Sequence, residues 1–206
     1  LTEISLVDFS IQWSDHYFFD RNALARQGCT NIKLVNNELY GAGYSSIGNA
    51  NPGSFRALVS KWDLQGNPIW SKEINLNDVS DQFFRNLFVS EQNLYLFGRT
   101  INELNRRPYI TITKLDLNGE VLASKRMTFG SNEEVVPSLF DECWFEDGSL
   151  NVCGSIGRKG FFAKLSVEDF DNEDECFGFE ELDYTERDLD LVRESNPIFE
   201  LNSGLT

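Results

Sequence analysis

A single histidine, His16, limits the nucleophilic and acid–base chemistry open to this chain of 206 residues. A Ser-His-Asp triad or a Cys-His pair would have to use it, and neither a G-x-S-x-G motif nor a cysteine lies nearby in the sequence. The glycine motifs that cradle phosphates are also missing. The 33 acidic side chains could supply the carboxylate pair of a glycosidase, but no pair stands out among them. We therefore predict a protein with no catalytic residue and no cofactor.

One dense acidic run, at 168–175, is the place where a metal ion would be expected. Hard cations such as calcium prefer clustered carboxylate oxygens, which makes Asp169, Asp171 and Asp174 the candidate ligands. The run lacks the D-x-[DN]-x-[DN]-G spacing of a dedicated calcium loop. A solvated acidic turn is therefore the interpretation that we favour, with calcium binding as the alternative.

Four cysteines bear on redox chemistry and on zinc binding. None of them has a C-x-x-C spacing, which argues against a structural zinc site. Cys143 and Cys153 flank the predicted Asp147-Gly148 turn at nearly equal distances, so a hairpin would bring them close together across neighbouring strands. We predict a disulfide between these two residues, as an oxidising exterior would permit, and buried free thiols are the alternative.

The charge balance restricts the classes of partner. There are 18 basic and 33 acidic side chains, a net charge of −15, and such a surface repels phosphate backbones and anionic lipids. We expect no nucleic-acid partner.

No apolar run reaches the roughly 18 to 20 residues of a transmembrane helix, and no signal-peptide pattern is present. The first residue is Leu1, which fits a processed chain or a fragment of a longer one.

The chain repeats itself with a period of 50 to 56 residues. A five-residue segment from leucine to glycine occurs three times, at 39–43, 94–98 and 150–154. A second repeated segment follows each of these; it begins with a lysine, and the three lysines form a column when the copies are aligned, at Lys61, Lys114 and Lys164. We interpret the glycines as positions of close backbone approach, since glycine has no Cβ, with a place in a ligand channel as the alternative. The lysines are interpreted as solvated strand residues and not as catalytic bases.

Each copy predicts β-strands separated by polar turns, because runs of β-branched and aromatic residues end at Asn, Asp and Gly. In the second copy the turn at 116–119 should place its glycine at positive φ. The expected strands are 31–35, 39–45, 55–62 and 69–74 in the first copy, 84–89, 94–100, 109–115 and 121–127 in the second, and 143–145, 150–153 and 161–165 in the third.

Four antiparallel strands at this spacing are typical of a β-propeller blade, whereas a sandwich does not predict that every fourth strand returns to the same motif. We predict an all-β, β-propeller-like protein with three clear blades, part of a larger or incomplete propeller. The expected units are an N-terminal segment with strands of a preceding blade (1–28), blade 1 (29–80), blade 2 (81–130), blade 3 with an acidic closing segment (131–191) and an exit linker (192–206). Three blades leave terminal faces uncovered, so we expect other protein chains of a surface complex, or the remainder of a longer polypeptide, as partners.

The segments 55–70 and 109–125 resemble the propeller repeats of large cell-surface proteins of Bacteroidota that the type IX secretion system exports, some of which are gliding-motility adhesins. The resemblance extends over about residues 31–185 and carries over no catalytic residue. It implies an extracellular, cell-surface location and a binding or assembly role through protein–protein contacts. A carbohydrate-binding or carbohydrate-active propeller is the alternative. The four tryptophans fall mainly in strand-like positions, which favours core roles over sugar stacking, at Trp13, Trp62, Trp70 and Trp144.

Overall fold

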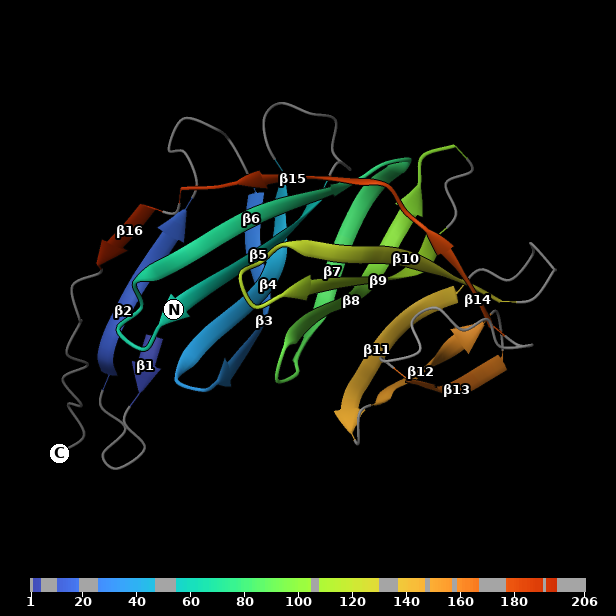
Figure 1. Ribbon diagram of the computed structural model, residues 1–206, viewed down its shortest axis with the longest axis horizontal. Helices are drawn as coiled ribbons and strands as arrows, with labels where there is room; N and C mark the ends of the chain where they lie inside the picture. The colour runs from blue at the N-terminus through green and yellow to red at the C-terminus, as the bar shows by residue number, and fades with distance from the viewer. Residues whose placement is uncertain are drawn as a thin grey trace, which may run out of the picture.

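The computed structural model of the protein describes residues 2–4, 11–18, 26–46, 55–104, 108–129, 137–146, 149–156, 159–166, 177–190 and 192–195. Within these ranges the regular secondary structure is all β-strand, and the strands form four antiparallel sheets (Figure 1). The all-β class predicted from the repeat is confirmed. The N-terminal sheet has the order β1-β2-β16 and contains β1 (Thr2–Ile4), β2 (Ile11–Phe18) and β16 (Val192–Ser195).

The other three sheets each contain one copy of the sequence repeat. The first sheet has the order β15-β6-β5-β4-β3, with β3 (Arg26–Val35), β4 (Glu38–Ser46), β5 (Arg56–Asp63), β6 (Pro68–Leu76) and β15 (Tyr184–Asp188). The second has the order β14-β10-β9-β8-β7, with β7 (Val79–Val89), β8 (Asn93–Asn102), β9 (Pro108–Asp116), β10 (Val121–Phe129) and β14 (Phe177–Glu181). The third has the order β11-β12-β13, with β11 (Pro137–Glu146), β12 (Ser149–Ile156) and β13 (Lys159–Ser166).

The second sheet is buried on both faces, which explains why β8 carries an unbroken apolar run at 94–97 instead of an alternating pattern. One hydrophobic cluster joins Leu96 of β8 to Ile74 of β6 in the first sheet. Another joins Ile112 of β9 to Val152 of β12 in the third sheet. Neighbouring residues of a strand point to opposite faces, so the sheets stack face to face with the second in the middle.

Turn chemistry follows the sequence closely. Asn36 and Asn37 have φ of 51° and 62°, as a tight hairpin between β3 and β4 requires. At the next hairpins Gly66 and Gly119 have φ of 77° and 87°, which confirms the positive φ expected for the second copy. The Asp116 carboxylate fixes that second turn by accepting hydrogen bonds from the backbone N–H groups of residues 118 and 120, at 2.8 and 2.9 Å.

Two of the repeated glycines, Gly43 and Gly98, lie opposite β-bulges. In the first sheet the register of β3 on β4 shifts after Cys29, which faces Gly43. In the second sheet the register of β7 on β8 shifts after Phe84, which faces Gly98. A Cβ added at Gly98 would lie 2.7 Å from the Phe84 Cα and would collide with the neighbouring Phe83 carbonyl. This confirms the interpretation that these glycines allow close backbone approach.

The C-terminal segment crosses back over the sheets in reverse order. We call strands β14, β15 and β16 the C-terminal strap; Figure 1 shows it, in orange to red, passing along one side of the molecule. β14 pairs with β10, β15 with β6, and β16 with β2. The prediction that the acidic segment closes blade 3 is therefore wrong for 177–181 and 184–188, which extend the second and first sheets. Residues 192–195, assigned to an exit linker, form a strand of the N-terminal sheet.

The sheets formed by the described strands do not close into a ring. Antiparallel meanders of four strands occur in the first and second sheets, β3 to β6 and β7 to β10, whereas three described strands make up the third. The structure therefore establishes stacked antiparallel sheets.

Candidate functional site

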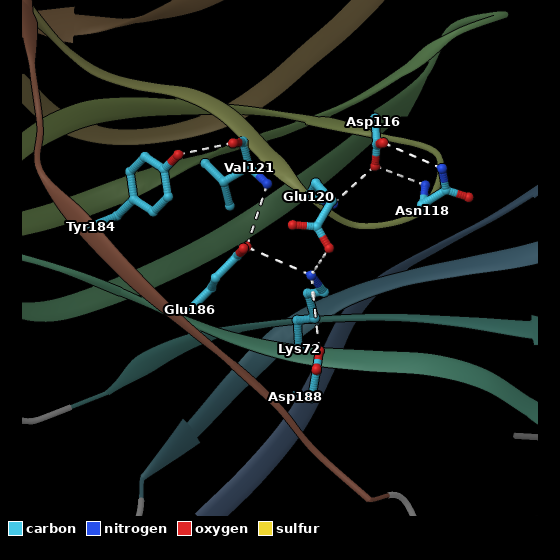
Figure 2. Close-up of polar contacts among 8 residues, drawn as sticks. All are labelled: Lys72, Asp116, Asn118, Glu120, Val121, Tyr184, Glu186 and Asp188. Carbon is cyan, nitrogen blue, oxygen red and sulfur yellow. Dashed lines mark hydrogen bonds and ion pairs between the residues drawn. The ribbon is translucent and has the colours of Figure 1, made fainter.

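A nearly buried lysine marks the place where the strap, the first sheet and the second sheet meet. Lys72 lies on β6, and its side chain is only 8% exposed. Figure 2 shows its ammonium group among three carboxylates, with Nζ 2.5 Å from Glu120 Oε1 and 3.8 Å from oxygens of both Glu186 and Asp188. Glu120 lies in the turn immediately before β10, and the other two acids come from β15. One cation thus joins three segments that are far apart in the sequence.

The turn before β10 positions Glu120. Asp116 N–H donates to the Glu120 carbonyl at 2.9 Å, and the Asp116 carboxylate caps the turn from within, as Figure 2 shows. The turn glycine, Gly119, lies against the ring of Trp70 on β6, where an added Cβ would be 3.0 Å from the indole carbons. Packing of this turn on the first sheet therefore brings the glutamate to the lysine.

The electrostatics of this cluster keep the lysine charged. Burial by itself lowers the pKa of Lys72, but the hydrogen bond to Glu120 and the charges of the other two acids outweigh it, so the pKa is raised. The same hydrogen bond lowers the pKa of Glu120. Glu186 differs, because desolvation raises its pKa. An ammonium group that holds its proton in this way is not a nucleophile or a general base at neutral pH.

Two strap side chains also satisfy backbone groups of Val121 on β10. The Tyr184 hydroxyl donates to the Val121 carbonyl at 2.9 Å, and Val121 N–H donates to Glu186 Oε2 at 3.4 Å (Figure 2). Val121 lies before the stretch of β10 that pairs with β14. The strap therefore covers this part of the β10 edge with side chains, where a strand ladder does not reach.

A second charged cluster surrounds Glu73, whose side chain is 2% exposed. Its carboxylate accepts from Arg56 Nη1 at 2.8 Å and from Ser45 Oγ at 3.0 Å, and it lies 3.3 Å from Nη2 of Arg187 on β15. A buried carboxylate is tolerated only when it is paired and hydrogen-bonded, and Arg187 contributes part of that compensation. The strap therefore contributes a charge to both clusters of the first sheet.

The second sheet holds the strap in a corresponding way. Lys125 on β10, whose side chain is 7% exposed, lies with Nζ 2.9 Å from Glu181 Oε1 on β14. Next to it, the Arg126 guanidinium donates to both oxygens of Glu180, at 2.6 and 2.5 Å. Bidentate pairing of this kind fixes geometry as well as charge. Lys72 and Lys125 each follow a serine and are 53 residues apart, as Lys61 and Lys114 are, so the site is itself part of the repeat.

Two lysines of the predicted column, Lys61 and Lys114, lie on strand faces, each over a tyrosine ring. Lys61 Nζ is 2.8 Å from Glu38 Oε1 and lies over the Tyr40 ring, 5.2 Å from its centroid. Lys114 lies over the equivalent Tyr95 ring at 5.9 Å. These are cross-strand pairs, since Tyr40 faces Lys61 and Tyr95 faces Lys114 in the register.

The structure does not test the predicted sites. Asp169, Asp171 and Asp174 lie outside the described residues, and no group of three His, Cys, Asp or Glu suited to a metal ion occurs among those that are described. The register pairs Cys143 with Val152 and Cys153 with Glu142, so the two cysteines are offset by one position. Their side chains are outside the described part, and the disulfide stays a prediction. His16 lies on β2 at the register position that faces Glu194.

The strap contacts were missed at the level of sequence, although two signals could have indicated them. One is the Ser71-Lys72 pair, which returns as Ser124-Lys125. The other is a weak seven-residue similarity in the tail between 177–183 and 184–190, with an aromatic residue first and acidic residues later. Both signals are short, which is why neither stands out against 33 acidic residues.

Comparisons with protein-family models, with curated proteins and with solved structures found no match. In the part of the chain that the structure describes, no helix is long and apolar enough to span a membrane.

Proposed function

We propose that the chain is a non-catalytic assembly module built on propeller-type sheets, which acts through protein–protein contacts at the cell surface. The stacking supports the propeller-type interpretation, because each copy of the repeat forms one sheet and successive sheets pack face to face. The sequence resemblance to exported surface proteins supports the location, and the net charge of −15 supports partners other than nucleic acids.

The observation that carries the proposal is a difference in exposure at one position of the repeat. Val59, Ile112 and Phe162 each lie two residues before the repeated lysine. Val59 is fully buried and Ile112 is 1% exposed, beneath the sheet that follows each of them. Phe162, on the third sheet, is 60% exposed. An aromatic side chain at a position that is otherwise covered by the next sheet indicates a face suited to further packing.

The register supports this equivalence. Val59 faces Ala42, Ile112 faces Phe97 and Phe162 faces Cys153, and each partner is the fourth residue of the leucine-to-glycine segment. We therefore propose that another protein sheet covers the outer face of the third sheet. It would come from another protein chain of a surface complex or from more of the same polypeptide.

The carbohydrate-active alternative receives no comparable support. Of the tryptophans whose side chains the structure describes, Trp62 is only 6% exposed and Trp70 packs against the core of the first and second sheets. A sugar-binding surface built on tryptophan would be expected to present an exposed indole face.

The test is size-exclusion chromatography with light scattering on the 206-residue chain. Without the proposed covering sheet, we expect the outer faces of separate molecules to associate in a concentration-dependent way. Phe162→Glu should then shift the distribution toward smaller species. Leu104→Glu is the matched control, because Leu104 is 88% exposed but lies in a turn and not on a sheet face. A compact, soluble monomer with a cooperative melt, unchanged by either substitution, would contradict the proposal.

A further inference from the structure

The strap docks on the sheets in steps of seven residues. Phe177 and Tyr184 open β14 and β15 and face the equivalent ends of β10 and β6, at Phe129 and Leu76. Leu182 and Leu189 follow the two strands, and their N–H groups donate to the carbonyls of equivalent serines, Ser124 at 2.8 Å and Ser71 at 2.9 Å. Residues 194 and 195 come seven positions after 187 and 188, and they face residues 16 and 15 of β2 in the N-terminal sheet. Each step therefore repeats the same ladder on the next sheet.

At one position of the step the charges are reversed between the two sheets. On the second sheet the basic residue belongs to the sheet and the acid to the strap, because Arg126 faces Glu180. On the first sheet the acid belongs to the sheet and the basic residue to the strap, because Glu73 faces Arg187. The fourth residue of each step thus meets a partner of opposite sign only on its own sheet.

The next position does not discriminate between the sheets. Lys125 faces Glu181, and Lys72 faces Asp188, so a lysine of the sheet meets an acid of the strap in both cases. This shared pair favours docking of either step on either sheet. The residue before it is one that does differ in charge between the two sheets.

A shift of the strap by one step would place like charges opposite each other. Glu180 would then face Glu73, a carboxylate that is already only 2% exposed. Like charges directly across a ladder are destabilising, and more so where solvent is excluded. Backbone hydrogen bonds cannot prevent such a shift, because the ladder is the same on both sheets.

We propose that the outer edges of β10 and β6 form a strand-binding surface that selects its ligand by charge, with Arg126 and Glu73 as the specificity-determining residues. The ligand that this surface fits is an extended segment with a seven-residue step. Each step has a large residue first, a charge opposite to that of the sheet at its fourth position, and an acid at its fifth. In this chain the strap supplies that ligand.

Engineered disulfide cross-links report where each step docks. Thr128 faces Gly178 in the second sheet, and Asn75 faces Thr185 in the first. The paired substitutions are therefore Thr128→Cys with Gly178→Cys, and Asn75→Cys with Thr185→Cys. Facing positions of an antiparallel pair lie within disulfide reach. Each pair is placed in the full chain, the protein is oxidised, and the cross-linked peptides are quantified by mass spectrometry, which separates them from any bond of the native cysteines.

Charge variants then test the selection. Glu180→Arg should lower the 128–178 yield at least about tenfold, since like charges at an interface cost several kcal/mol, and should leave the 75–185 yield unchanged. Adding Arg126→Glu to Glu180→Arg should restore the 128–178 yield. The control exchanges Glu181→Asp and Asp188→Glu, which keeps both signs and should change neither yield.

Three outcomes would overturn the proposal. The first is an unchanged 128–178 yield in Glu180→Arg, which would show that charge at this position is not selected. The second is loss of both cross-links in Glu180→Arg, because the proposal assigns Glu180 to the second sheet alone. The third is a loss of yield in the sign-preserving control that equals the loss in Glu180→Arg, because side-chain shape and not charge would then determine docking.

Discussion

Substitution of Gly98 by alanine should destabilise the protein strongly, although it adds a single methyl group. The new Cβ would lie 2.7 Å from the Phe84 Cα and 2.8 Å from the Phe83 carbonyl carbon. Carbon atoms pack at about 3.5–4.0 Å, so β7 would have to move away by roughly 0.8 Å or more. The obstacle is the backbone of a paired strand, which cannot rotate aside as a side chain can.

The expected cost follows from three terms. Overpacking costs about 1–3 kcal/mol, and weakening one ladder hydrogen bond at the bulge adds about 0.5–1.5 kcal/mol. Alanine also restricts the unfolded chain more than glycine does, and this offsets about 0.4–1 kcal/mol of the lost stability. The net loss is about 1–4 kcal/mol, and for a chain of this size each kcal/mol lowers the Tm by roughly 2–4 °C.

Urea denaturation and thermal melts of Gly98→Ala measure this cost. Gly41→Ala is the matched control and should cost less than Gly98→Ala. Its Cβ would meet the Trp62 ring at 2.6 Å, and a side chain can shift where a paired backbone cannot. Gly43→Ala is the repeat equivalent of Gly98→Ala and should behave as it does, since its Cβ would lie 3.0 Å from the Gly28 carbonyl carbon. A Gly98→Ala protein within about 0.5 kcal/mol of the wild type would refute the reasoning, because that is the scatter of neutral surface substitutions.

Three further predictions concern the strap and the turn beneath it. Tyr184→Phe should cost about 0.5–1.5 kcal/mol in urea unfolding, because it removes one hydroxyl hydrogen bond. Gly119→Ala should cost about 1 kcal/mol or more, since φ is +87° and the Trp70 ring lies 3.0 Å from the new Cβ; a melt above that of the wild type would contradict this. The pKa of Glu120 is lowered by Lys72, so its stabilising contribution is complete above the ordinary value of 4.5 and is lost as the pH falls through the folded-state value. The protection factors of β15 amides, which compare the observed hydrogen-exchange rate with the intrinsic rate at the same pH, should therefore fall at low pH in the wild type and fall less in Glu120→Gln. An equal fall in both would count against the mechanism.

The repeat and its turns could be predicted from the sequence because their signals are local. Positive φ at Gly119 follows from a four-residue turn, and the close approach at Gly98 follows from a glycine that recurs inside a strand. The strand predicted at 94–100 lies within β8, Asn93–Asn102, because its apolar run is long and ends at polar residues. Periodicity is informative here because burial decides which residues these strands contain.

The strap could not be predicted in the same way, because burial does not decide its sequence. In β15 every residue after Tyr184 is exposed, so the strand lacks the alternation that marks one with a buried face. Its partner in the ladder lies more than 100 residues away, since Arg187 faces Glu73. A charged, exposed strand at the edge of a sheet is also what protects that edge from pairing with other chains. The charged residues of this tail therefore serve two purposes in the fold. The charge at the fourth position of each step selects the sheet on which that step docks, and the exposed charges protect the edges of both five-stranded sheets.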